Sequence, residues 1–165
     1  MPDASTILID SPAARGAAVV AVVRAAARLR REHEALCQAH GLSGQQFNVL
    51  RILRGAERAG ENALPTMTVG ERMIEPEPGV TRLMGRLEAK GLVQRVRCPS
   101  DARCVRCALT PAGHAALAAL DSPLDALHAV SLDGLSDADV ATLVALLVRA
   151  LPDPVPSSLP PSCPT

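Results

Sequence analysis

The sequence predicts a mainly α-helical fold that carries one small β-hairpin. Hydrophobic residues make up 48% of the 165 residues, and Ala, Leu and Val supply most of them, a composition suited to a core built from helices. Apolar residues recur at three- and four-residue spacing through several segments. Residues 92–97 and 103–109 instead read as two short strands, joined by turn-forming residues at 99–102. A chain of this length is one domain that can bury most of its apolar surface.

The stretch from 78 to 109 contains the most informative pattern. Its apolar residues fall at i, i+3, i+4 and i+7 and so form one stripe of a helix: Val80, Leu83, Met84 and Leu87. Arg82 and Arg86 lie on the opposite side, and Gly91 occupies the position of a left-handed cap. The predicted hairpin follows at once.

A shorter helix is expected before this one. Thr68 and Glu71 form a capping box that predicts a helix through Ile74, and the turn 75–78 then leads into the arginine-bearing helix. Met67 is expected to form a short strand pair with the hairpin. Helix, turn, second helix and hairpin together predict a winged helix-turn-helix, in which the hairpin is the wing.

Two long helical segments flank this unit. The first covers residues 13–39, and a helix over 44–54 follows, capped by Ser43 with Gln46 and closed by Gly55. After the hairpin, Thr110 caps a helix that is expected to run to about residue 120 and to resume after Ser122-Pro123. Ser136 caps the last helix. The first and last helices carry apolar stripes that one small domain is not expected to bury, which predicts a homodimer.

Charge is distributed unevenly although the chain is formally neutral. Residues 82–106 contain seven Lys or Arg against two acidic residues, whereas residues 107–165 contain one against six. A local basic patch attracts a polyanion whatever the total charge. Phe47 is the only aromatic among Phe, Trp and Tyr, which argues against single-stranded nucleic acid, because its recognition relies on stacking. Double-stranded DNA is the polyanion that fits.

At this point the sequence resembles the MarR (multiple antibiotic resistance regulator) family of bacterial transcription factors. Three runs carry the resemblance: residues 80–95, Asp101-Ala-Arg103 and Ala108-Leu-Thr-Pro-Ala-Gly113. It implies a recognition helix, a wing tip and the start of the following helix, in that order. It also implies a homodimer that binds a pseudo-palindromic operator and releases it when a small-molecule effector binds.

The resemblance and the residues together give a division of the chain. It comprises a flexible N-terminus (1–12), an N-terminal dimerisation helix (13–42), a winged helix-turn-helix DNA-binding region (43–113), C-terminal dimerisation helices (114–151) and a Pro-rich flexible tail (152–165). Within the DNA-binding region, Thr81, Arg82 and Arg86 are expected to contact bases or phosphates in the major groove. Arg103 is expected to enter the minor groove, and Asp101 to support the wing. The alternative for Arg86 is an ion pair with Glu88 or Asp101.

Five cysteines raise redox and metal alternatives. Without a secretory leader they are expected to be reduced thiols. Cys98 and Cys104 flank the wing turn, so the hairpin could bring them together as an oxidation-sensitive switch. A zinc site from Cys98, Cys104, Cys107 and His114 is disfavoured, because residues three apart on a strand point to opposite faces. Cys37 lies on a helix stripe and is expected in the core. No metal or cofactor is predicted.

The leading hypothesis is therefore a dimeric, sequence-specific, double-stranded DNA-binding transcription regulator in the cytoplasm, a repressor released by a small ligand. The alternatives are a winged-helix protein-interaction module, motivated by zero net charge, Glu75 and Glu77, and a thiol-based redox regulator. Steep loss of DNA binding with added salt separates the first from the second. No catalytic motif and no apolar run long enough for a membrane span occur, so we expect neither an enzyme nor a membrane protein.

Overall fold

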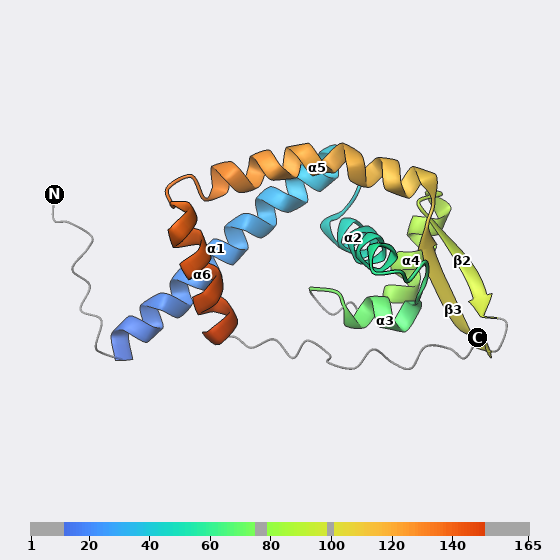
Figure 1. The fold of residues 1–165 in the computed structure, drawn as a ribbon, viewed down its shortest axis with the longest axis horizontal. Coiled ribbons are helices and arrows are strands. Elements are labelled where there is room, and N and C mark those ends of the chain that lie inside the picture. The colour runs from blue at the N-terminus through green and yellow to red at the C-terminus, as the bar shows by residue number, and fades with distance from the viewer. Residues whose placement is uncertain (1–11, 75–78, 99–100, 151–165) are drawn as a thin grey trace.

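The computed structural model describes residues 12–74, 79–98 and 101–150, and the side chains of 97–104 are not described. The described elements are α1 (Pro12–Ala39), α2 (Gly44–Arg58), β1 (Leu64–Pro65), α3 (Thr66–Glu71), α4 (Val80–Ala89), β2 (Val93–Cys98), β3 (Asp101–Leu109), α5 (Pro111–Ser131) and α6 (Asp137–Ala150). Figure 1 shows α1 and α5 crossing above a unit made of α2, α3, α4 and the strands, with α6 at the end away from the wing. The predicted mainly helical winged helix-turn-helix is confirmed. The segments predicted to be flexible, 1–12 and 152–165, and the turn 75–78 lie outside the described residues, except that Pro12 begins α1.

Helix α2 begins as predicted but ends later. Ser43 Oγ accepts from Gln46 N at 3.2 Å, and Gln46 Oε1 accepts from Ser43 N at 3.1 Å, so the capping box is confirmed. The prediction that Gly55 closes the helix is wrong. Gly55 lacks a positive φ, and buried Ala56 continues the helix into the core, so the left-handed stop comes at Gly60, with φ +92°.

Helix α3 starts two residues before the predicted cap. Its first residue is Thr66, whose hydroxyl donates to Val105 O at 3.1 Å and so fastens the helix start to β3. Thr68 is buried inside the helix and does not cap it. Met67 is an exposed helical residue, and the strand that pairs with the wing is Leu64–Pro65 instead. Tertiary contacts with the sheet therefore override the local capping signal.

The sheet is antiparallel with β3 between β1 and β2. Val93 pairs with Leu109 at the base of the hairpin, and the register then runs regularly to Arg97 opposite Val105. Between Arg97 and Cys98 the register shifts, so that Cys98 lies opposite Asp101. The wing is thus regular at its base and irregular towards its tip.

Helix α5 is one continuous helix. The predicted break at Ser122-Pro123 is wrong, because Pro123 lies inside α5. Leu120 and Leu124 on either side of it are buried in the core and keep the helix packed. The predicted cap is confirmed: Thr110 Oγ1 accepts from Gly113 N at 3.1 Å. At α6, Ser136 Oγ likewise accepts from Asp139 N at 3.3 Å.

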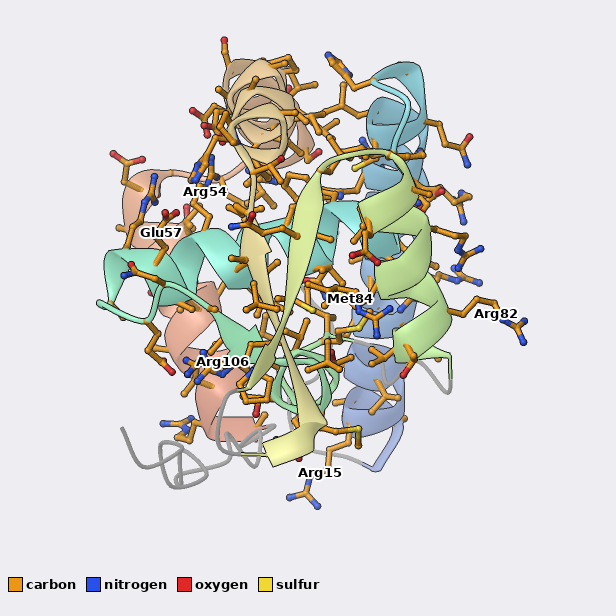
Figure 2. The ribbon with its side chains drawn as sticks, turned by 90° about the vertical axis from the view of Figure 1, so that its right-hand side faces the viewer. Arg15, Arg54, Glu57, Arg82, Met84 and Arg106 are labelled. Atoms are coloured by element: carbon orange, nitrogen blue, oxygen red, sulfur yellow. The ribbon has the colours of Figure 1, made fainter. Side chains whose placement is uncertain are left out.

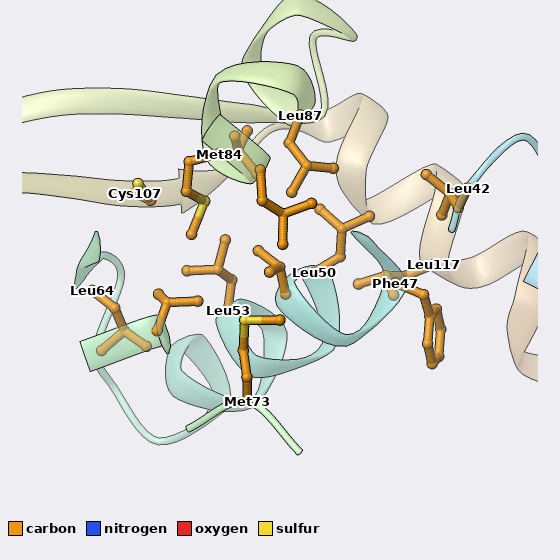
Figure 3. Packing of buried hydrophobic residues seen from close by; sticks show 14 of the residues in the cluster. Leu42, Phe47, Leu50, Leu53, Leu64, Met73, Met84, Leu87, Cys107 and Leu117 are labelled. Carbon is orange, nitrogen blue, oxygen red and sulfur yellow. The ribbon is translucent and has the colours of Figure 1, made fainter. Parts of the chain in front are cut away.

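The core lies where α2, α4, α5 and the sheet meet (Figure 3). The whole predicted stripe of α4 is buried there: Val80, Leu83, Met84 and Leu87. Leu50 from α2, Leu117 from α5 and Cys107 from β3 are completely buried. The buried stripe fixes which side of α4 remains available to the outside.

The outer helices leave apolar surface uncovered. No residue of α6 is buried, and Val144 and Val148, one turn apart, are 56% and 66% exposed. Val19 and Val23 of α1 are exposed to a similar degree. Such continuous apolar faces on two helices are typical of an interface with another protein surface.

Candidate nucleic-acid interface

Helix α4 presents its polar side to solvent. Thr81, Arg82 and Arg86 are exposed, while the opposite stripe is buried in the core. Figure 2 shows Arg82 pointing away from the body of the molecule and Met84 pointing into it. Gly85, between the arginines, has open space where a Cβ would be. Helix α4 therefore offers two guanidinium groups on a face without bulky side chains, as close approach to a DNA groove requires.

Other basic residues near this face are used inside the protein. Arg95 lies 3.7 Å from the carboxylate of Glu88, and Arg106 donates to Ala63 O at 2.7 Å. Lys90 donates to Gly41 O at 2.6 Å and so links the end of α4 to the turn after α1. Within the described residues, Glu88 thus pairs with Arg95 and not with Arg86. The alternative that Arg86 pairs with Glu88 is therefore wrong, whereas its pairing with Asp101 stays a prediction, because that side chain lies outside the described ones.

The tip of the wing contains the remaining predicted residues. The backbones of Cys98, Asp101, Arg103 and Cys104 belong to β2 and β3, but their side chains lie outside the described ones. The expectation that Cys98 faces Cys104 is wrong, because the register shift places Cys98 opposite Asp101. The roles of Arg103, Asp101 and the two cysteines remain predictions.

The two described cysteines are buried thiols. Burial raises the pKa of Cys37 to about 11, and the thiol lies 3.8 Å from His33 Nδ1. Burial also raises the pKa of Cys107, whose Sγ lies 3.4 Å from Thr66 Oγ1. Since the thiolate is the reactive form, both thiols are protonated and unreactive at neutral pH. Cys37 lies in the core, as expected from the sequence. Among the described residues, no three His, Cys, Asp or Glu side chains gather as a metal site would require.

A cavity of about 590 Å³ lies beside the helix-turn-helix. It is lined by residues of α1, of α2 with its cap, and of the segment just after α3: Ala26, Leu29, Arg30, His33, Glu34, Ser43, Gly44, Gln45, Phe47, Asn48, Arg51, Met73 and Ile74. The size suits a small ligand, and the lining combines an aromatic ring with guanidinium groups. Asn48 Oδ1 is buried without a hydrogen-bond partner among the described residues. An unpaired buried acceptor is costly, so a ligand that donates to it after a rotation of the Asn48 side chain would gain binding energy.

Comparisons with known proteins identify the family. A model described as MarR family matches residues 40–103. The crystal structure of a MarR transcription factor from Planctomyces limnophilus is 31% identical, with a TM-score of 0.64, over 85% of this chain and 98% of that one. This chain belongs to the MarR family. A cysteine variant of MarR from E. coli, solved with operator DNA, is 26% identical with a TM-score of 0.70, over 79% of this chain and 91% of that one.

A third match concerns regulation by a small molecule. BpsR from Bordetella bronchiseptica is 26% identical with a TM-score of 0.64, over 80% of this chain and 98% of that one. Its structure is described as a mechanism for regulation of its DNA binding by 6-hydroxynicotinic acid. The MarR resemblance inferred from residues 80–113 is thus confirmed. In the described part of this MarR-family chain, no helix is both long and apolar enough to cross a membrane.

Sequence reasoning missed the cavity. Its lining comes from three separate segments, and most of the lining residues also fit ordinary helix positions. The polar residues Asn48 and Arg51 lie on one side of α2 at i and i+3, but α2 also contains other polar and charged residues, so this pair is not a distinctive signal.

Proposed function

We propose that this protein is a dimeric, sequence-specific regulator of transcription, a repressor that binds a pseudo-palindromic operator and releases it when a small ligand binds. The observation that carries the proposal is the two-sided helix α4, with Arg82 and Arg86 exposed over a buried apolar stripe. Thr81 and the wing residue Arg103 would add contacts to phosphate and to the minor groove, with Asp101 supporting the wing. We expect no catalytic activity, and we expect the protein to act in the cytoplasm, where the DNA of a bacterium lies.

Dimerisation is the second part of the proposal. One winged helix buries little surface on DNA and binds weakly, whereas two at a fixed spacing bind a two-fold-related site much more tightly. The uncovered apolar faces of α1 and α6 support a two-fold interface, since α6 and the N-terminal half of α1, which carries Val19 and Val23, lie away from α4 and the wing (Figure 1). The protein-interaction alternative is not favoured by the family.

The ligand part of the proposal concerns the cavity. Met73 and Ile74 line it and are the last described residues before the turn 75–78 that leads to α4. A ligand between α1 and α2 would therefore press against Met73 and Ile74, which follow α3, and change the position of α4 relative to the DNA. Arg30 and Arg51 favour a ligand with a negative charge. Phe47 favours an aromatic ring in the ligand, and Asn48 favours a hydrogen-bond donor on that ring. Aromatic carboxylates with a hydroxyl or amino group combine these features.

The deciding experiment is selection from a pool of random duplexes, followed by binding to the enriched sequence. We expect a site with two-fold symmetry and half-sites about one helical turn apart, bound by a dimer with affinity that falls steeply with salt. Enrichment of no sequence, with binding independent of salt, would contradict the proposal.

Arg82→Ala should remove sequence discrimination. We expect a loss of about 1–3 kcal/mol on the selected duplex and little change on random DNA, because a guanidinium that contacts a base edge serves only the matching base. Fluorescence anisotropy with the two duplexes measures both values. Arg15→Ala in α1 removes the same charge from an exposed site far from α4 and is the matched control. Equal losses on both duplexes would place Arg82 on phosphate instead.

Arg51→Ala should weaken ligand binding without affecting DNA binding. In a thermal-shift screen of hydroxylated and aminated aromatic carboxylates, we expect the ligands that stabilise the wild type to bind at least about tenfold more weakly to the variant, since a charge-assisted hydrogen bond contributes about 1.5–3 kcal/mol. Arg58→Ala, in the same helix but outside the cavity, is the control. If both variants bind the ligands like the wild type, the ligand lies elsewhere.

A further inference from the structure

Two histidines from different helices stack against each other beside α2. The ring of His33 in α1 lies 6.1 Å from that of His128 in α5, with 19° between the planes. Phe47 of α2 also contacts His33, with its ring 5.3 Å from that of His33 and tilted by 59°. Three helices therefore meet at one pair of imidazoles. Neutral rings can stack in this way, whereas two imidazolium rings at this distance repel each other.

The charged groups that face this pair come from all three helices. They are Arg30 and Glu34 of α1, Arg51 and Arg54 of α2, and Asp121 and Asp125 of α5, with the thiol of Cys37 also adjacent. Two of the three carboxylates already have partners. Asp121 accepts one hydrogen bond from each terminal nitrogen of the Arg54 guanidinium, both at 2.9 Å, and Glu34 accepts one from Gly44 N at 2.7 Å. Asp125 is exposed at the edge of the small cavity of about 210 Å³ beside the pair.

Protonation of His33 is therefore less favourable in the folded protein than in the unfolded chain. Burial lowers the pKa of His33, and the neighbouring His128 and Arg51 lower it further, against a smaller opposite effect of Glu34. As the pH falls, the unfolded chain takes up this proton before the folded one does. The stability that the neutral ring provides is complete above about pH 7 and is lost as the pH falls towards the pKa of the folded state.

The histidine pair also lies at the contact between the two helices α1 and α5. Helix α5 runs from the end of the wing, at Pro111, towards α6, and α1 carries the exposed apolar face. The imidazoles join α5 to α1, and these two helices connect the parts that we assign to the dimer with the DNA-binding unit of α2, α3, α4 and the strands (Figure 1). A change in how α5 meets α1 here alters the angle, and hence the spacing, of the two recognition helices of a dimer.

We propose that His33 and His128 form a proton-operated switch, in which protonation of the stacked rings separates α5 from α1 and α2 and lowers the affinity for operator DNA. This inference rests on the proposed function, because the readout is DNA binding. By linkage, DNA binding must in turn favour the neutral, stacked rings. A fall in pH would thus lower the affinity for DNA through this site even when no ligand is bound in the larger cavity.

The test is the affinity for the selected duplex between pH 7.5 and 5.5 at constant ionic strength. Ordinary electrostatics predicts tighter binding in acid, because protonated histidines add positive charge. The switch predicts the opposite sign, with a loss of about tenfold or more, as one unit of pKa difference between the bound and released states gives a factor of ten per site. Asp121 and Glu32 do not interfere, since hydrogen bonds from Arg54 and Arg28 hold their pKa values below the ordinary carboxylate range.

Variants separate the pair from the rest of the chain. His33→Gln and His128→Gln should each abolish the loss in acid, and His40→Gln, an exposed residue near the end of α1, should retain it. Wild-type binding that is unchanged or tighter at pH 5.5, or an acid loss that survives in both cluster variants, would overturn the switch. The exposed position of His128 makes its variant safe for folding even if His33→Gln unfolds.

A second measurement distinguishes failure of the switch from failure of the proposed function. A chain that binds no duplex at pH 7.5 contradicts the function, and the switch is then judged by NMR of the four histidine C2 protons. The His33 signal must titrate at lower pH than a peptide histidine and must move towards it in His128→Gln. If His33 titrates like a peptide histidine, or ignores His128, the two rings are not coupled and the switch is overturned.

Discussion

Gly113→Ala should destabilise the fold by about 3 kcal/mol, the largest loss that we expect from adding a single methyl group. A Cβ at this position would lie 2.2 Å from the carbonyl oxygen of Leu92 and 3.1 Å from the side chain of Leu109. The oxygen belongs to the backbone and already accepts from Thr110 N at 3.2 Å, so it cannot move without disturbing the junction of β2 and α5. Calorimetry should show a melting temperature lower by roughly 6–12 °C for a domain of this size.

Gly55→Ala is the matched control for this prediction. Gly55 lies within α2, is exposed and has nothing within 4 Å of the position of a Cβ. Because glycine is unfavourable inside a helix, the substitution should stabilise the protein by roughly 0.5–1 kcal/mol. A Gly113→Ala protein that melts at the wild-type temperature would show that α5 and β2 can separate freely here.

Val144→Asp combined with Val148→Asp should produce monomers and reduce operator affinity by at least about a hundredfold. Two carboxylates one turn apart on α6 would have to be buried in the proposed interface, which is costly without partners. Losing the second winged helix also removes the gain from simultaneous binding at two half-sites. Light scattering gives the oligomeric state, and anisotropy with the selected duplex gives the affinity.

The control places the same change on another exposed valine. Val96→Asp lies on β2 of the wing, 51% exposed and far from α6, so it should leave the protein dimeric. A double variant of α6 that remains a dimer at low concentration would show that the two-fold interface uses other surfaces.

The parts of the fold that were predictable from the sequence are those determined by the regular spacing of apolar residues within one helix. The stripe of α4 and its stop at Gly91, with φ +69°, follow from residues within twelve positions of each other. The errors at Gly55, Thr68 and Pro123 share a cause. Each residue is a local break or cap signal, and in each case buried neighbours or a bond to another element, such as Thr66 to Val105, decided otherwise.

The candidate site divides in the same way. The exposure of Arg82 and Arg86 could be predicted, because it is the complement of the buried stripe. The pairing of Glu88 with Arg95 could not, because it depends on how β2 turns back beside α4. The stacked His33 and His128 are 95 positions apart in the sequence, and only the crossing of α1 and α5 brings them together.

The division of α4 into an inner and an outer face bears on how new specificity can arise. Positions 81, 82, 85 and 86 have no part in the core, so substitutions there can change which bases are preferred at almost no cost in folding. A variant library restricted to these four positions should therefore remain largely folded while it samples many operators. Exchanging the whole helix for one from another regulator would instead replace four core side chains and disturb the packing of α2 and α5. Regulators of this architecture can thus diverge in their targets while one scaffold is kept.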